Sequence, residues 1–143
     1  MTAHTLAPSF SLRDHHDKLV DLDAQKGHPV VLFFYAGDLT SACTVQLSAV
    51  RDEWSKFSTA GAHVFGISQG TVASHLHFKA SCGLPFPLLV DDGKRVAKKY
   101  GAIDTLKKTT IIRRMVVVID RNQRIIYRKL GMPKITDILK HIS

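Results

Sequence analysis

The sequence has no apolar run long enough to cross a membrane or to form the core of a signal peptide. Residues 1–17 mix His, Ser, Arg and Asp, and the apolar segment at residues 30–35 is only six residues long. We therefore expect a cytoplasmic protein with no membrane association. The chain has 143 residues, 45% of them hydrophobic, which is enough for one globular domain spanning residues 1–143.

Cysteine is also scarce, because only Cys43 and Cys82 are present. Two cysteines can form at most one disulfide, and in a reducing compartment such thiols are more often redox-active or simply buried than joined in a structural disulfide. A Cys-x-x-Cys pair is missing, since Thr40 and Gln46 occupy the two positions where a partner of Cys43 would stand. This argues against dithiol exchange of the thioredoxin kind. The eight histidines lack neighbouring Cys, Asp or Glu at zinc spacing, so we expect no metal and no cofactor.

Acidic residues are few in the last third of the chain. From Lys94 onward there are fourteen Lys and Arg against three Asp and Glu, whereas up to Gly93 there are six against nine. Such a basic excess is typical of nucleic-acid-binding proteins. The positive residues are scattered, however, and only Tyr100 and Tyr127 lie among them. We interpret them as a solvated face and do not expect specific nucleic-acid binding, whose sign would be salt-dependent retention of DNA or RNA.

Strand and helix patterns alternate along the chain. Strands are expected at residues 10–12, 18–22, 30–35, 62–68, 88–90, 115–119 and 124–129. Helices are expected from near Cys43 to Gly61, from Thr71 to Ser81 or Cys82, at residues 94–100, and after Pro133. This order predicts an α/β protein with a thioredoxin-like fold, in which helices flank a central mixed β-sheet and an N-terminal β-hairpin is added.

Cys43 is the most informative residue of this pattern. It follows the buried strand at residues 30–35 and falls in the first turn of the next helix. Unpaired backbone N–H groups and the helix dipole favour an anion there, which lowers the pKa of a thiol. A reactive thiolate is one interpretation. The alternative is a small buried cysteine that packs as a hydrophobic residue.

The chain resembles the peroxiredoxins, and most closely their Q-type subgroup, also called bacterioferritin comigratory proteins. The similarity covers nearly the whole chain. It includes residues 7–12 (APSFSL), 27–35 (GHPVVLFFY), 66–68 (GIS), 83–89 (GLPFPLL) and 114–120 (RMVVVID). The family signature P-x-x-x-T-x-x-C is met at Thr40 and Cys43.

The resemblance implies a thiol-dependent peroxidase that acts on hydrogen peroxide and organic hydroperoxides. Cys43 would be the peroxidatic nucleophile, Thr40 would hydrogen-bond the peroxide, and Arg114 would be the catalytic arginine. A guanidinium can stabilise both the thiolate and the leaving oxygen. Taken alone, Thr40 could instead be an ordinary helix N-cap, and Arg114 could be a solvated charge at the start of a strand.

Several positions depart from the family pattern. The signature proline is Ala36, residues 41–42 are Ser-Ala in place of the usual Pro-Gly, and Gln46 replaces a glutamate. The resolving cysteine five residues after the first is Ser48. Cys82 is then the remaining internal partner for a sulfenic acid, one turn later than the position that some Q-type members use. Three alternatives stay open. Cys82 resolves the sulfenic acid, an outside thiol does so in a one-cysteine mechanism, or Cys82 is a buried residue with no part in the reaction.

The expected partners are a peroxide substrate and thioredoxin or another thiol reductant, and the resemblance suggests a monomer. A second hypothesis is a non-catalytic redox sensor or binding protein that retains the fold. Such a protein would be oxidised once at Cys43 without sustained peroxide turnover.

Overall fold

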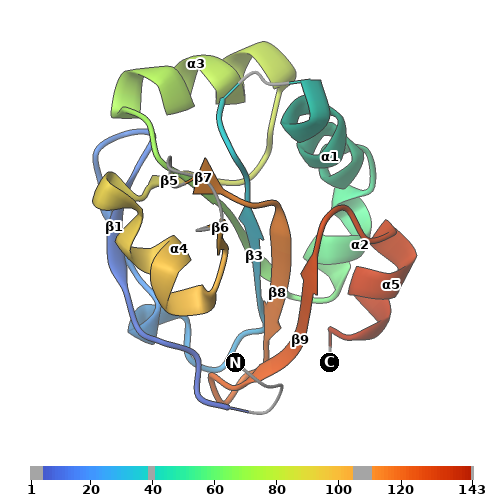
Figure 1. Cartoon of the computed structure of the whole chain (residues 1–143). Helices are drawn as coiled ribbons and strands as arrows, with labels where there is room; N and C mark the ends of the chain where they lie inside the picture. Colours follow the sequence, from blue (N-terminus) through green and yellow to red (C-terminus); the bar gives the residue numbers. More distant parts are fainter. Residues whose placement is uncertain (1–4, 39–40, 105–110, 143) are drawn as a thin grey trace.

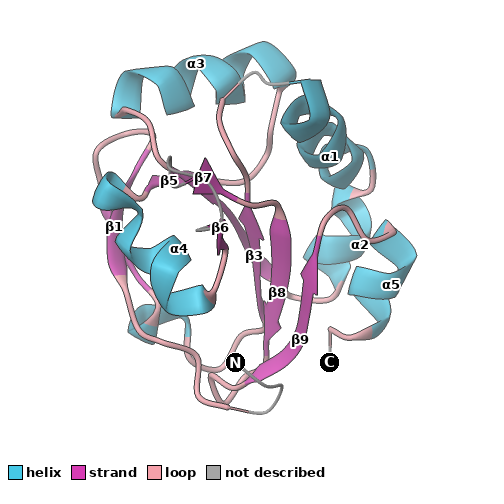
Figure 2. Cartoon of the chain, in the orientation of Figure 1, coloured by secondary structure: helices cyan, strands magenta, loops and turns pink. Residues whose placement is uncertain are grey.

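The computed structural model describes residues 5–38, 41–104 and 111–142, while the side chains of residues 41–43 and 104 lie outside that description. Within these ranges a seven-stranded mixed sheet forms the centre of the molecule (Figures 1 and 2). In spatial order its strands are β2 (Leu19–Asp21), β1 (Ser11–Asp14), β5 (Leu88–Val90), β4 (His63–Ser68), β3 (Val30–Phe34), β8 (Met115–Ile119) and β9 (Ile125–Leu130). The predicted thioredoxin-like architecture is confirmed.

Strand direction brings several segment ends to one edge of this sheet. β3, β4 and β5 run parallel, so their carboxyl ends lie together. β8 runs antiparallel to β3 with Phe34 opposite Met115, so the start of β8 meets the end of β3 at the same edge. The predicted N-terminal hairpin is also present, because β1 pairs with β2 antiparallel and joins the sheet through β5.

Alternate residues of β3 enter different hydrophobic clusters on the two faces of the sheet. Val30, Leu32 and Phe34 join one cluster, which includes residues of the helix α4 (Arg95–Tyr100). Val31 and Phe33 join the other, which is covered by α1 (Ser41–Asp52), α2 (Trp54–Thr59), α3 (Val72–Cys82) and α5 (Ile135–Lys140). Burial on both faces explains why the β3 sequence is continuously apolar rather than alternating.

One prediction about the elements is wrong, and one pair of strands was not predicted. The single helix expected from Cys43 to Gly61 is two helices, because Glu53 has a non-helical backbone (φ −109°, ψ 22°) between α1 and α2. The change of direction lets Trp54 and Phe57 pack with the aromatic rings of the second cluster. A short ladder of β6 (Ile103–Asp104) and β7 (Ile111–Ile112) was not expected, since two-residue strands carry no detectable period.

The helix ends follow the capping chemistry of the sequence. Thr71 and Ser74 form a reciprocal capping box at the start of α3, and Gly83 ends the helix in the left-handed conformation (φ 60°). Short 3₁₀ turns, Asp23–Gln25 and Asp92–Lys94, complete the described elements.

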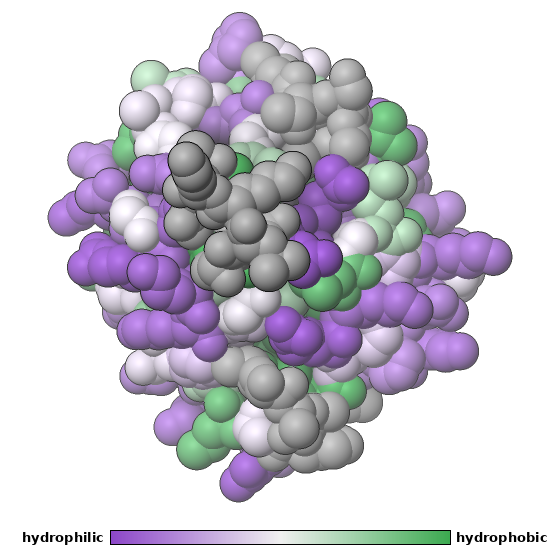
Figure 3. Space-filling view, in the orientation of Figure 1, coloured by the Kyte–Doolittle hydropathy of each residue, from purple (hydrophilic) through white to green (hydrophobic). Residues whose placement is uncertain are grey.

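Hydrophilic residues dominate the visible face, with apolar residues in separate patches (Figure 3). No helix among the described residues has the length and apolar character needed to span a bilayer.

Candidate active site

The chain leading to Cys43 leaves the central sheet at the edge where three parallel strands end. Tyr35 follows β3, is fully buried, and donates its backbone N–H to Ile67 O at 3.1 Å. The helix α1 then begins at Ser41, which makes Cys43 the third residue of the helix. The prediction that Cys43 lies in a first helical turn is therefore confirmed for the backbone. Its side chain and the whole of Thr40 lie outside the described residues.

A hydrogen-bonded cluster fixes the segment just before α1. The Asp38 carboxylate accepts from Tyr35 Oη at 2.8 Å and from Ser74 Oγ at 2.8 Å, and it lies 2.7 Å from His75 Nδ1. His75 Nε2 lies 2.9 Å from the carbonyl oxygen of Leu89. His75 is fully buried, and the Asp38 side chain is 10% exposed. Side chains from α3 thus hold a residue five positions before Cys43.

The electrostatics of this cluster favour an ionised Asp38. Burial by itself would raise the pKa of the carboxyl group. The hydrogen bond and the charge of His75, together with hydrogen bonds from Ser74 and Tyr35, outweigh burial and hold the pKa of Asp38 below its ordinary value. Sequence reasoning missed this cluster. The available signal was that His75 and Phe78 are three residues apart in a predicted helix, which places both on one face.

Arg114 stands on the other side of the chain that leads to Cys43. It immediately precedes β8, and the register places it next to the residues that follow β3. The side chain is half-buried, and its Nε atom is buried without a hydrogen-bond partner among the described residues. Part of the Arg114 guanidinium is therefore withdrawn from solvent.

A small cavity of about 270 Å³ opens beside Arg114. Its walls are Ala36, Ile111, Ile112, Arg113, Arg114, Leu130 and Gly131. Ala36 is exposed and occupies the position where the family signature has proline. A second depression of about 320 Å³ shares Ala36, Ile111 and Ile112 with it. Space for a small substrate therefore lies next to the buried guanidinium nitrogen and the segment before Cys43.

Gln46 connects α1 to the Arg114 side of this cavity. Its Nε2 donates to Gly131 O at 3.4 Å, and Gly131 N donates to Arg114 O at 2.8 Å. Gln46 is 5% exposed, and its Oε1 is buried without a partner among the described residues. Because Gln46 is three residues after Cys43 in α1, the two share a helix face.

Cys82 is the last residue of α3, where it is half-buried and carries a free thiol. Arg51 Nη1 donates to Cys82 O at 2.5 Å and ties this end of α3 to α1. Arg51 lies eight residues after Cys43, which corresponds to about 12 Å of helical rise. The contact of Cys82 with α1 is therefore made at the far end of that helix from Cys43.

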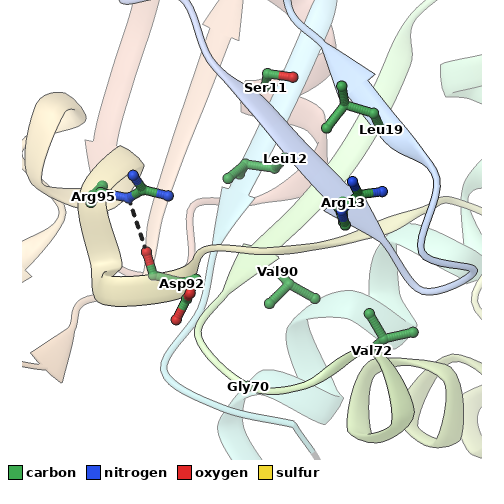
Figure 4. Close-up of a pocket in the computed structure, with 9 residues that line it drawn as sticks. All are labelled: Ser11, Leu12, Arg13, Leu19, Gly70, Val72, Val90, Asp92 and Arg95. Carbon is green, nitrogen blue, oxygen red and sulfur yellow. Dashed lines mark hydrogen bonds between the residues drawn. The ribbon is translucent and has the colours of Figure 1, made fainter.

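A larger cavity of about 480 Å³ lies elsewhere, between the N-terminal hairpin and the segments before α3 and α4 (Figure 4). It is lined by Ser11, Leu12, Arg13, Leu19, Gly70, Val72, Val90, Asp92 and Arg95. Its two arginines already have partners, since Arg13 pairs with Asp17 and Arg95 Nε donates to Asp92 O. None of the predicted site residues lines this cavity. Within the described ranges no three His, Cys, Asp or Glu residues group as metal ligands.

Comparison with known sequences decides the family. The sequence profile of the AhpC/TSA family matches residues 3–128. The chain belongs to this family. Within it the chain is a Q-type peroxiredoxin, because it is 38% identical over 145 aligned residues to the chloroplastic peroxiredoxin Q of Sedum lineare, covering all of this chain and 75% of that protein.

The relatives of this peroxiredoxin are longer than the chain, and some are covered to a smaller share than the Sedum lineare protein. The chloroplastic peroxiredoxin Q of Oryza sativa subsp. japonica is 46% identical over 116 residues, which are 81% of this chain and 53% of the rice protein. The chain therefore spans about half the length of that relative. Among solved structures, peroxidoxin BcpB from Mycobacterium tuberculosis superposes with a TM-score of 0.91 at 25% identity, covering 99% of this chain and 96% of that one.

Proposed function

We propose that this chain is a thiol-dependent peroxidase that reduces hydrogen peroxide and organic hydroperoxides through Cys43. The observation that carries the proposal is the position of Cys43 in the first turn of α1, at the sheet edge where Arg114 keeps a buried, unpartnered Nε among the described residues. A helix N-terminus and a guanidinium both favour a thiolate. The relatives named peroxiredoxin Q support the same activity.

The reaction needs only the thiol and a peroxide. The Cys43 thiolate attacks one peroxide oxygen, so that an S–O bond forms while the O–O bond breaks. The leaving hydroxide or alkoxide takes up a proton and departs as water or alcohol, and Cys43 is left as a sulfenic acid. Arg114 stabilises the charge on the leaving oxygen, and the Thr40 hydroxyl hydrogen-bonds the peroxide.

The sulfenic acid is then reduced by a thiol, which displaces water and forms a disulfide. Cys82 or an outside thiol fills this role, and thioredoxin or another thiol reductant supplies the two electrons. An internal disulfide needs Cα atoms within about 7 Å. We propose that unwinding of the first turns of α1 or of the end of α3 brings the two sulfurs together, because helix ends open most easily.

The other features of the proposal come from the sequence. We propose a cytoplasmic monomer with a single domain, which uses no cofactor and binds neither membranes nor specific nucleic acids. The chloroplastic location named for the plant relatives belongs to those proteins.

A turnover assay tests the proposal. Reduced protein is mixed with excess hydrogen peroxide or an alkyl hydroperoxide, and peroxide loss is followed with thioredoxin and its reductase, with glutathione, and with dithiothreitol. We expect many turnovers for the native chain and none for Cys43→Ser. A single equivalent of peroxide consumed with every donor would instead support the redox-sensor hypothesis. If Cys82→Ser leaves thioredoxin-supported turnover unchanged, Cys82 is not the resolving residue.

A further inference from the structure

The Asp38 carboxylate is the centre of a buried polar cluster that the proposed chemistry does not use. Tyr35 Oη donates to one of its oxygens at 2.8 Å, and Ser74 Oγ donates to the other at 2.8 Å. His75 Nδ1 lies 2.7 Å from that second oxygen. Tyr35 follows β3 and the other two residues belong to α3, so the cluster joins the chain before Cys43 to a separate element.

His75 acts in this cluster through both ring nitrogens. A backbone carbonyl oxygen can only accept a hydrogen bond, so Nε2, at 2.9 Å from Leu89 O, carries a proton. A carboxylate oxygen also accepts, so a proton lies between Nδ1 and Asp38 as well. The imidazole and the carboxyl group therefore share one proton along the 2.7 Å contact, while Nε2–H is held by Leu89 O. A pair of this kind is directional and holds Asp38 in one place.

Gly70 shows how closely the surrounding backbone packs against the cluster. A Cβ at this position would lie 3.1 Å from His75 Cε1, 3.1 Å from Ser74 Oγ and 3.3 Å from Asp38 Oδ2. The backbone φ of +154° is also one that side-chain-bearing residues rarely adopt. The loop after β4 therefore also packs against Asp38, in addition to Tyr35 and α3.

We propose that Asp38, held by His75, Ser74 and Tyr35, is a positioning residue for Cys43. It lies two residues after Ala36, which lines the candidate cavity, and five residues before Cys43. By fixing Asp38 to α3, the cluster sets where the chain turns into α1 and therefore where the thiolate stands relative to Arg114. This inference rests on the proposed function of Cys43, because what it explains is the geometry of attack on a peroxide.

The test compares Asp38→Asn with Asp120→Asn, which makes the same chemical change at the opposite edge of the sheet. Asp120 follows β8, and its Oδ1 accepts from the backbone N–H groups of Asn122 and Arg124. The rate constant of Cys43 oxidation by hydrogen peroxide is measured by stopped flow. We expect Asp38→Asn to lower it about 100-fold, the scale of a misplacement near 1 Å, and Asp120→Asn to change it less than about twofold.

A second rate separates positioning from loss of the thiolate or of the fold. Alkylation of Cys43 by iodoacetamide, above the pKa of its thiol, needs an accessible thiolate but no alignment with Arg114. In Asp38→Asn we expect this rate to stay within about threefold of the native rate, while peroxide oxidation falls. Equal losses in both rates, or an unchanged peroxide rate in the folded variant, would overturn the inference.

A milder variant covers the case in which Asp38→Asn does not fold. Tyr35→Phe removes one hydroxyl donor to Asp38 and keeps the buried ring. We expect it to slow peroxide oxidation about threefold without changing alkylation, and an unchanged peroxide rate counts against the inference. If the native protein itself does not react with peroxide at Cys43, the proposed function fails, which is a distinguishable result.

Discussion

The two flanks of the chain that leads to Cys43 are built differently. On the α3 side, the Asp38 carboxylate and both ring nitrogens of His75 have hydrogen-bond partners. On the β8 side, Arg114 Nε and Gln46 Oε1 are buried without partners among the described residues. A saturated network rigidifies the backbone, whereas a buried polar group held without a partner is available to a ligand. Under the proposed function, the first flank holds the site and the second meets the substrate.

The largest effect should come from the saturated flank and should appear as stability. His75→Ala removes the His75 hydrogen bond to the Asp38 carboxylate and opens a hole beside Tyr35. Taking a partner from a buried carboxylate costs about 3 kcal/mol, and urea unfolding measures it. A decrease in the free energy of unfolding of less than about 1 kcal/mol would mean that the His75–Asp38 contact does not stabilise this flank.

The β8 flank should respond in rate rather than in stability. Arg114→Lys keeps a positive charge but loses the planar guanidinium, so we expect peroxide oxidation of Cys43 to slow about 100-fold. The free energy of unfolding should change by less than about 0.5 kcal/mol. Arg121→Lys is the matched control, because Arg121 donates to Gly27 O at the opposite edge of the sheet. If Arg114→Lys lowered the free energy of unfolding strongly but left the rate of Cys43 oxidation unchanged, the proposed difference between the two flanks would be wrong.

A smaller effect is expected on the stability of the protein at acidic pH. The pKa of Asp38 is lowered in the folded protein, so its contribution to stability is complete above the ordinary value of 3.8 and is lost as the pH falls through the lower folded value. The quantity to follow is the difference in the free energy of unfolding between the native chain and Asp38→Asn as the pH falls from about 5. It should shrink below about pH 4. A difference that is independent of pH would contradict ionic pairing at Asp38.

The smallest effect is expected at Gln46. Gln46→Glu adds a negative charge three residues after Cys43 on the same helix face, which raises the pKa of the thiol. We expect alkylation of Cys43 at pH 7 to slow about threefold, with Asn122→Asp, in an exposed turn at the other edge, as the control of equal charge. Faster alkylation in Gln46→Glu would contradict this placement of Gln46.

Local patterns accounted for most of the fold. The continuous apolar stretch at residues 30–35 predicted β3, and Thr71 with Gly83 predicted both ends of α3. The break at Glu53 was missed because it depends on aromatic packing against Phe86 from another part of the chain. The β6–β7 ladder was missed because it is too short to show a period.

The candidate site could be predicted only where it is local or where the resemblance supplied it. Cys43 followed from the strand and helix patterns, and Arg114 from the similarity to the peroxiredoxins. Asp38 and His75 are 37 residues apart, and no motif links them in the sequence. Their pairing arises because β3 and β4 run parallel, which brings the chain before α1 next to the start of α3.

The most direct test of Cys43 as the peroxide-reactive residue is to map its oxidation. Reduced protein is treated with one equivalent of hydrogen peroxide, free thiols are alkylated, and the peptides carrying Cys43 and Cys82 are examined by mass spectrometry. We predict that Cys43 is oxidised, either as a sulfenic acid or in a disulfide with Cys82. A Cys43 that stays a free thiol after peroxide treatment would contradict the proposed function.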